Sequence, residues 1–280
     1  MKDYLNTISG FPCERLLKGL IRSCFLFLFL FIYTNASSQE NILSDRWSYN
    51  TAFTMPKGKW ESGIFQQFRY GISNRIELRA NALLVPILPN AGIRINLGTV
   101  GTFHFASEHS LSIPSVFLNI VSFKVTGGLI SPQYSFGFIA SVTNTVYVSR
   151  QFGAGSVISA DAGLAFAIRS SKPDYQSTID IPLIYQRTAH WYDGASVKTE
   201  LLFKGTILKN LFYEECVKLF LITRPDDNIF LENSGCIMWS ARGSFRIRGG
   251  YVLSWGKYPF GNHWQMWPAI DFIFGSKIKE

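Results

Sequence analysis

The sequence offers few residues that could carry catalysis, and most of them are histidines. His104 and His109 flank Ser107 and Glu108 in the stretch FHFASEHS, and two further histidines stand alone. A Ser, a His and a Glu together could form a hydrolase site. However, residues this close in a β-turn rarely converge on one substrate, and no oxyanion-hole signature accompanies them. We therefore expect a polar turn at 107–109 and no enzymatic activity.

Cys216 and Cys236 make no zinc spacing with the scattered histidines, so no metal or cofactor is expected. Between them lies RPDDN (224–228), a run rich in turn formers. If the turn centres on Asp226, the two cysteines lie directly opposite each other on one face. Opposed Cβ atoms are then about 4.5 Å apart, which is within disulfide reach. We predict a disulfide, although a slip of one residue would put the two thiols on opposite faces.

Alternation of apolar and polar residues with a period of two predicts the β-strands that position these histidines and cysteines. Apolar residues alternate with Ser, Gly and Thr over 134–149, and with Ser, Asp, Gly, Ala and Arg over 156–169. The segment 75–84 alternates in the same way. These runs exceed the roughly 5 to 6 residues usual in a soluble sandwich and approach the length that crosses a bilayer. The pattern predicts an all-β fold, a transmembrane antiparallel up-and-down β-barrel.

We expect about twelve strands, in keeping with the even strand number of bacterial barrels. Their starts lie near Trp47, Trp60, Arg75, Ala91, Leu111, Tyr134, Gly155, Tyr192, Leu211, Ile229, Gly243 and His263. This count requires that 47–54 is a strand and that 179–190 belongs to an outer loop. The alternative is that 179–185 pairs as a strand. On the last strand the lipid face is expected to hold Trp264, Met266, Pro268, Ile270, Phe272 and Phe274.

The N-terminus has the layout of a cleaved signal peptide over residues 1–38, which leaves 39–280 for the barrel. Basic residues precede the apolar run CFLFLFLFIY (24–33), and small residues follow it. Cleavage after Ala36 or after Ser38 fits equally well. The run is too short to span a bilayer, which needs about 20 apolar residues. We expect export across the inner membrane and insertion into the outer membrane of a Gram-negative cell, with lipid and the barrel-assembly machinery as partners.

The remaining chain carries a mild net positive charge that is spread along the sequence. This argues for an anionic membrane surface and against nucleic acid as a partner. Only 16% of the residues are charged, against about 25% in ordinary soluble domains, and 15% are aromatic. A chain poor in charge, rich in aromatics and without a run of 18 apolar residues after the leader fits a closed membrane barrel.

Strand alternation places a set of charged residues on the face turned to the lumen. These residues are Arg69, Arg75, Glu77, Arg79, Arg94, Arg246, Arg248, Glu200, Glu214 and Glu232. If the hairpin centres on Ile72, Arg69 lies opposite Arg75, which is a costly like-charge pair unless water or an anion intervenes. The arginines gather on one side of the barrel, and Glu200, Glu214 and Glu232 cluster on the other, with Lys198 and Lys218 among them. Such an arrangement favours anions in an open pore, but the same groups could pair and close the lumen.

Three short motifs give a family resemblance over residues 55–97. MPKGKWESG (55–63), RYGISNRIELRA (69–80) and PNAGIRINL (89–97) resemble the outer-membrane family associated with the meta-pathway of phenol degradation. The resemblance implies a barrel that passes small, often aromatic, molecules. Two functions stay open on the sequence. One is a passive channel or transporter for small, aromatic or anionic solutes, and the other is a non-conducting structural or surface-binding barrel with a plugged lumen.

Overall fold

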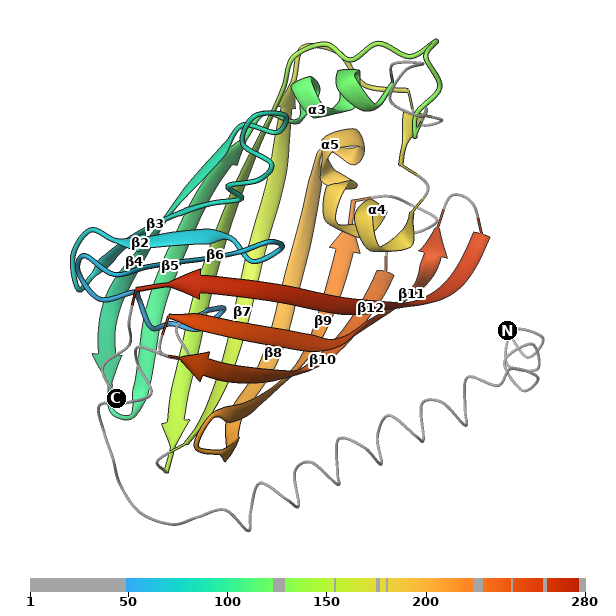
Figure 1. Ribbon diagram of the computed structural model, residues 1–280. Coiled ribbons are helices and arrows are strands. Elements are labelled where there is room, and N and C mark those ends of the chain that lie inside the picture. The colour runs from blue at the N-terminus through green and yellow to red at the C-terminus, as the bar shows by residue number, and fades with distance from the viewer. Residues whose placement is uncertain are drawn as a thin grey trace, which may run out of the picture. The chain divides into compact units, whose positions relative to one another are not determined.

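The computed structural model describes residues 49–122, 129–153, 155–174, 177–179, 181–223, 229–242, 244–258 and 261–276. The expected signal peptide at 1–38 lies outside these residues, and so does the RPDDN turn at 224–228. The described chain is the barrel itself, and its strands are labelled in Figure 1.

Within the described residues, twelve antiparallel strands close into one barrel, so the predicted fold class is confirmed. Each strand pairs with its neighbours in the chain, and β12 returns to pair with β1, for example through Ser62 and Phe274. In chain order the strands are β1 (Trp60–Gly63), β2 (Phe68–Gly71), β3 (Ile76–Ala80), β4 (Asn90–Val100), β5 (Phe103–Ser112), β6 (Ile139–Phe152), β7 (Ser156–Arg169), β8 (Ala195–Leu208), β9 (Leu211–Ile222), β10 (Ile229–Arg242), β11 (Phe245–Tyr258) and β12 (Gly261–Gly275).

The strand total is correct, but three of the twelve expected strands differ. The strand expected from Leu111 is β5, which begins at Phe103 and ends at Ser112. The described part of 47–54 forms no strand, and the strand expected from Trp60 is instead the hairpin of β1 and β2. One expected strand is lost and one is gained. Strand alternation could not show this, because four-residue strands such as β1 and β2 are too short to display a period.

The predicted turn at 107–109 is also wrong, because these residues lie inside β5. His109 pairs with Ile93 of β4 and with Asn144 of β6. Glu108 points inward and is buried, whereas His109 is exposed on the outer face. The actual turn lies at Gly101, where a positive φ of 60° favours glycine. The Ser, His and Glu of this stretch therefore point to opposite sides of the barrel wall.

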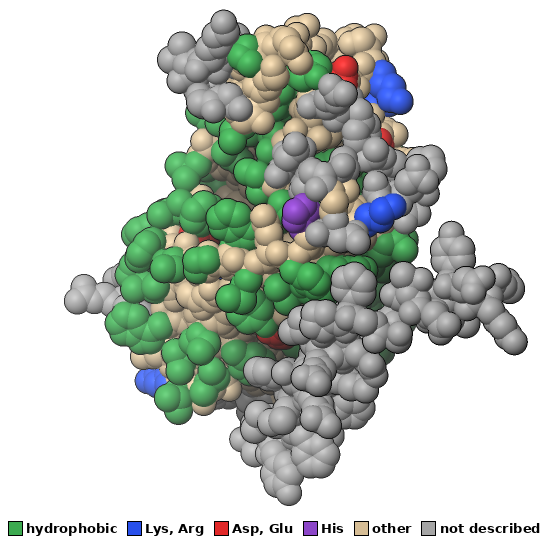
Figure 2. Space-filling view, turned by 90° about the vertical axis from the view of Figure 1, so that its right-hand side faces the viewer, with side chains coloured by type: hydrophobic (Ala, Val, Ile, Leu, Met, Phe, Trp, Pro, Cys, Tyr) green, Lys and Arg blue, Asp and Glu red, His purple; other side chains and the backbone are tan. Residues whose placement is uncertain are grey.

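The outer face of the barrel is apolar, as the alternation predicts. All six residues expected on the lipid face of β12 are exposed. Trp255 and Trp264 face each other across β11 and β12, with ring centroids 5.8 Å apart. Figure 2 shows hydrophobic side chains gathered in a broad patch over one side of the wall. An apolar exterior with aromatic pairs suits a wall that contacts hydrocarbon.

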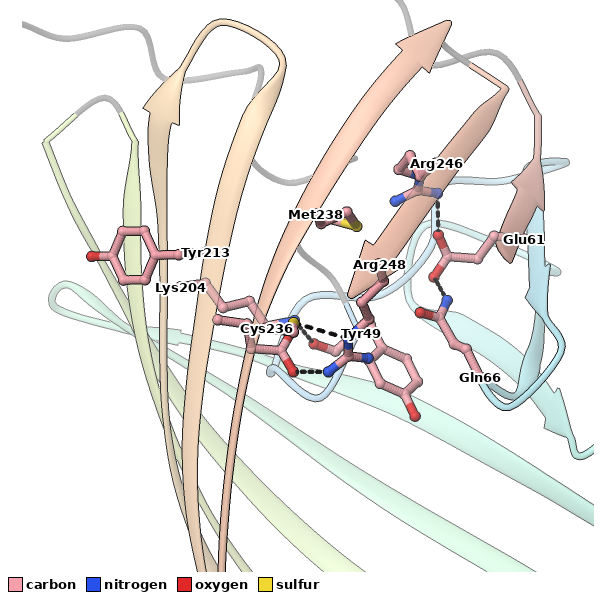
Figure 3. Close-up of a pocket in the computed structure, with 10 residues that line it drawn as sticks. Tyr49, Glu61, Gln66, Lys204, Tyr213, Cys236, Met238, Arg246 and Arg248 are labelled. Atoms are coloured by element: carbon pink, nitrogen blue, oxygen red, sulfur yellow. Dashed lines mark hydrogen bonds and ion pairs between the residues drawn. The ribbon is translucent and has the colours of Figure 1, made fainter. Parts of the chain in front are cut away.

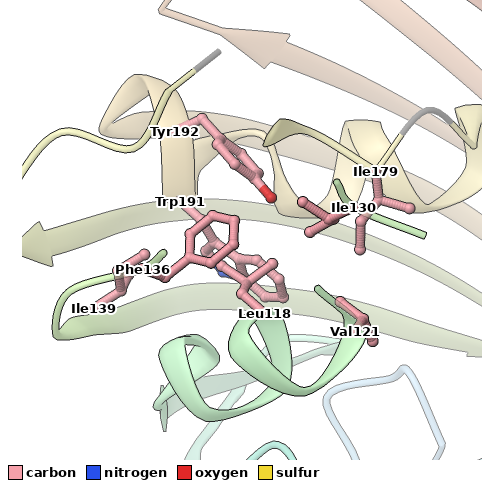
Figure 4. Packing of buried hydrophobic residues seen from close by; sticks show 8 residues of the cluster. All are labelled: Leu118, Val121, Ile130, Phe136, Ile139, Ile179, Trp191 and Tyr192. Atoms are coloured by element: carbon pink, nitrogen blue, oxygen red, sulfur yellow. The ribbon is translucent and has the colours of Figure 1, made fainter. Parts of the chain in front are cut away.

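A hydrophobic cluster covers one end of the barrel next to α3 (Pro114–Val121). Pro114 starts this helix, where its missing N–H costs nothing. The side chain of Asn119 bonds both the N–H and the carbonyl of Phe136, which ties the helix to the following segment. The cluster in Figure 4 consists of Leu118, Val121, Ile130, Phe136, Ile139, Ile179, Trp191 and Tyr192.

Two short helices, α4 (Pro182–Thr188) and α5 (His190–Asp193), lie in the long connection before β8. In Figure 1 they lie within the ring of strands, and they contact the inward faces of β7, β8, β9 and β11. Residues 181–190 therefore form no strand, which leaves the even strand count intact. In the described residues, none of the helices has the length and apolar character needed to cross a membrane.

Candidate functional site

The barrel interior is crossed by the chain just before β1, which we call the luminal segment (Tyr49–Met55). Residues 51 to 55 are all buried. Inward side chains from β3, β4, β6 and β8 hold its backbone. Met55 N–H donates to Glu77 Oε2 (2.7 Å), and Ala52 N–H donates to Ser149 Oγ (2.7 Å). Arg94 Nη1 donates to Thr51 O (2.7 Å), and Lys204 Nζ donates to Tyr49 O (2.5 Å). The residues expected to form the first strand therefore fill the lumen instead.

One aromatic residue anchors this segment in the barrel. Phe53 packs against Val157, Phe212 and Met238 from three different strands. At the end of the segment the chain passes so close to Gly71 that a Cβ there would lie 2.2 Å from the Pro56 carbonyl oxygen. Glycine at this position of β2 lets the segment leave the lumen along the wall.

The arginines of β2, β3 and β4 lie inside the barrel and are joined by glutamates. Arg69 and Arg79 are direct cross-strand partners, which is the like-charge arrangement expected for Arg69 and Arg75. Glu77 offsets the repulsion between the two arginines, because it pairs with Arg69 at 2.7 Å and with Arg79 at 3.3 Å. Carboxylates of the protein thus occupy the place where water or an anion was expected.

Two more glutamates complete this network, and strand alternation gave no warning of either. Glu61 joins Arg69 at 2.7 Å to Arg246 at 2.6 Å, across the closure of the barrel. Glu108 pairs with Arg79 and, at 2.7 Å, with Arg94. Glu108 was assigned to a turn because its neighbours Ser107 and His109 are polar, which hides the alternation of β5 at this point.

The opposite side of the lumen carries three smaller ion-pair groups. Each glutamate expected there has lysine or arginine partners. The pairs are Lys198 with Glu200 (3.1 Å) and Asp161 (3.1 Å), Glu214 with Lys204 (3.0 Å) and Arg248 (2.6 Å), and Glu232 with Lys218 (2.9 Å) and Arg187 (2.7 Å). The charges do not stand as separate acidic and basic walls, because nearly every group has an opposite partner beside it.

Of the ten charged residues expected in the lumen, Arg75 is the one that the structure places elsewhere. It lies in the turn before β3 and is exposed. The hairpin does not centre on Ile72, since Gly71 pairs with Glu77 and Arg69 with Arg79. The register therefore differs from the expected one by four residues, which moves Arg75 out of the paired region.

The predicted disulfide is also wrong. Both cysteines are free, with Cys216 opposite Ser234 and Cys236 opposite Glu214. Both thiols face inward, but a two-residue difference in register makes them diagonal neighbours. Such neighbours are about 7 Å apart, beyond the roughly 4 Å between Cβ atoms that a disulfide needs. Cys236 Sγ instead accepts a hydrogen bond from Arg248 Nε at 2.9 Å.

The helices α4 and α5 are fastened to the wall by polar contacts. The guanidinium of Arg187 pairs with the Glu232 carboxylate, and its Nη2 lies 2.7 Å from both carboxylate oxygens. Gln186 accepts hydrogen bonds from Ser254 and Tyr258, at 2.9 and 3.0 Å. These bonds reach β10 and β11, so the helices are tied to the strands that face them.

His190 of α5 also contacts the wall. Its Nε2 lies 2.7 Å from Ser141 Oγ of β6, and desolvation by burial lowers the pKa of His190 to about 4. Its Nδ1 has no hydrogen-bond partner in the described chain. The carboxylate that would orient a catalytic histidine is therefore missing from this Ser–His pair.

Among the described residues, cavities remain between these groups. One, of about 380 Å³, lies beside the luminal segment and α4, and its lining includes Tyr49, Arg187, Lys218, Arg248 and Trp267. A second cavity of about 190 Å³ lies next to α5. The gap drawn in Figure 3, of about 20 Å³, separates Arg246 and Glu61 from Lys204 and is near the size of one water.

Among the described residues, no group of three or more His, Cys, Asp and Glu side chains is placed to hold a metal ion. No family model matches the chain, and no curated protein matches it in sequence.

Two solved structures illustrate what the fold is similar to. One is the CymD monoaromatic hydrocarbon channel, at 8% identity and a TM-score of 0.36, covering 77% of this chain and 50% of that one. The other is the outer membrane channel DcaP of Acinetobacter baumannii, at 8% identity and a TM-score of 0.38, covering 87% of this chain and 68% of that one. This chain thus spans half the length of CymD. Its solute has to be argued from its own residues.

Proposed function

We propose that this protein is an outer-membrane channel for small molecules and that the state described here is closed. The observation that carries the proposal is the luminal segment, whose backbone is held by side chains of the wall and whose main apolar anchor is Phe53. A plug of this kind can leave without breaking a strand pair. A lumen meant to stay shut could be filled by side chains of the wall alone.

The cavity of about 380 Å³ supports a solute that is partly apolar and partly polar. Trp267 faces inward from β12 and is 45% exposed there, which offers an aromatic surface inside the barrel. Arg187, Lys218 and Arg248 line the same cavity. The resemblance of residues 55–97 to the phenol meta-pathway family agrees with a small aromatic molecule, and the arginines add a preference for anions.

Planar-bilayer recordings of the purified protein test this proposal. Phe53→Ala should raise the frequency of conductance steps, because removing a buried phenylalanine costs about 3–5 kcal/mol of packing. Replacing residues 51–55 by Gly and Ser should raise it further. Phe138→Ala is the matched control, since Phe138 is 56% exposed and should leave the recordings unchanged.

Ion selectivity provides a second test of the channel proposal. Arg79→Ala should reduce anion preference in the opened Phe53→Ala background, whereas Arg75→Ala should not, because Arg75 is exposed outside the lumen. If neither plug variant conducts more than the wild type, the channel proposal fails. The alternative, a non-conducting barrel closed by its ion pairs, would then hold.

A further inference from the structure

The second cavity, of about 190 Å³, has the chemistry of a binding site that the channel proposal does not use. It lies between the inward faces of β3 to β6 and the helices α4 and α5. A single buried water needs only about 15 Å³, so the space suits a small organic molecule. One part of the lining is apolar, with Leu88 and Trp191, and the rest is polar.

Two deeply buried side chains on this cavity each have a polar atom without a hydrogen-bond partner in the described chain. Arg79 is 4% exposed, and its Nη2 has no hydrogen-bond acceptor in the described chain. His190 is 6% exposed, and its Nδ1 is also without a partner. A buried polar group without a partner destabilises the protein, and more so when it is charged. Groups of this kind on the wall of a cavity indicate that something polar belongs there.

The charge around the cavity favours an anion. Four arginines share three glutamates in the network beside it, namely Arg69, Arg79, Arg94 and Arg246 with Glu61, Glu77 and Glu108. On the other side Arg187 and Lys218 share Glu232. Glu108 lines the cavity too, but it is engaged by Arg79, Arg94 and the Tyr147 hydroxyl. Among the described residues, the first network therefore holds more cations than carboxylates, whereas Lys218 of the second also lies near Glu200.

Hydroxyl groups supply further donors. Ser110, Ser112, Ser141 and Thr143 line the cavity from β5 and β6, and Ser112 pairs directly with Ser141. An arginine with several hydroxyls is a usual donor set for a carboxylate. We propose that this cavity binds a small organic carboxylate, held by Arg79, by His190 and by the hydroxyls of β5 and β6. The apolar part of the lining would contact the carbon skeleton.

The affinity of this cavity for an anion should depend on pH. His190 faces Ser141 of β6 directly, and the charged groups on the same cavity are Arg79 of β3, Glu108 of β5 and Arg187 of α4. An anion beside the imidazole stabilises its protonated form, so binding should tighten as the pH falls. A site that bound the anion through Arg79 alone should bind it more weakly as the pH falls, because acid would then protonate only the ligand.

The test is calorimetric titration of the detergent-solubilised protein with propionate, with propionamide of the same shape and with inorganic phosphate. Propionate should bind in a saturable way, more tightly at lower pH, while propionamide should not. Phosphate should bind more weakly, because it cannot use the apolar lining. Arg79→Gln should weaken propionate by about tenfold, and Arg75→Gln should leave it unchanged.

His190→Gln is a second variant that guards against a folding defect in the arginine variant, since it should weaken propionate binding and remove its pH dependence. Quenching of Trp191 fluorescence, absent in Trp191→Phe, should follow the same titration. Equal binding of propionate and propionamide, tighter binding of phosphate, or no saturable signal would each overturn the proposal. Because nothing here requires conduction, these outcomes are independent of the bilayer recordings.

Discussion

Glu77 is the residue that most stabilises the charged inward face of β2 and β3. It is fully buried, pairs with Arg69 and Arg79, and accepts the Met55 N–H of the luminal segment. Glu77→Gln removes the charge that separates two arginines placed directly opposite each other. Breaking a buried ion pair in this way should cost about 3–5 kcal/mol.

Urea unfolding followed by tryptophan fluorescence measures this loss. Arg75→Gln is the control, because an exposed turn residue should change the free energy of unfolding by less than about 0.5 kcal/mol. Equal stability of the Glu77→Gln and wild-type proteins would show that the arginines are kept apart by something other than Glu77.

The cysteines give a second prediction at this scale. Because Cys216 and Cys236 are diagonal neighbours and not opposed, the mature protein should show two free thiols when denatured without reductant. Maleimide labelling followed by mass measurement counts them, and Cys236→Ser should show one. A wild-type protein without reactive thiols would mean that the register of β9 and β10 differs from the one described.

At the scale of elements, α5 should respond to acid through His190. Burial lowers the pKa of this imidazole to about 4, whereas a released helix would have the ordinary value of about 6.5. The released state therefore binds more protons between these values. The stabilisation of the docked helix is complete above about pH 6.5 and is lost as the pH falls toward 4, by on the order of 3 kcal/mol in total.

Hydrogen exchange of residues 181–193 measures this response. Protection should be lower at about pH 5 than at neutral pH after correction for the intrinsic exchange rate. In His190→Gln the difference should shrink, because the imidazole that takes up the proton is gone and Asp193, whose pKa burial raises, is the other group of α5 that could respond. An undiminished acid response in this variant would place the sensitivity on another group.

At the scale of the whole molecule, closure of the barrel predicts how the protein behaves in detergent. Every strand has two paired neighbours, so no edge is open, and the outer wall is apolar. The mature protein should stay with the outer-membrane fraction through high-salt washing and dissolve only in detergent. On SDS gels an unheated sample should migrate differently from a heated one, because the closed sheet resists SDS. Release as a soluble periplasmic protein would contradict the membrane assignment.

The sequence by itself determined the closed all-β architecture, the apolar wall and most of the lumen-facing charges. Each of these follows from period-two alternation, which every long strand from β6 to β12 repeats over 12 to 15 residues. Only the tertiary structure decided that 49–55 fills the lumen, that Glu108 lies on a strand and that Arg75 lies outside. It also decided that the cysteines stay apart. These outcomes depend on register and on what the interior can hold, and both are set by contacts between residues far apart in the chain.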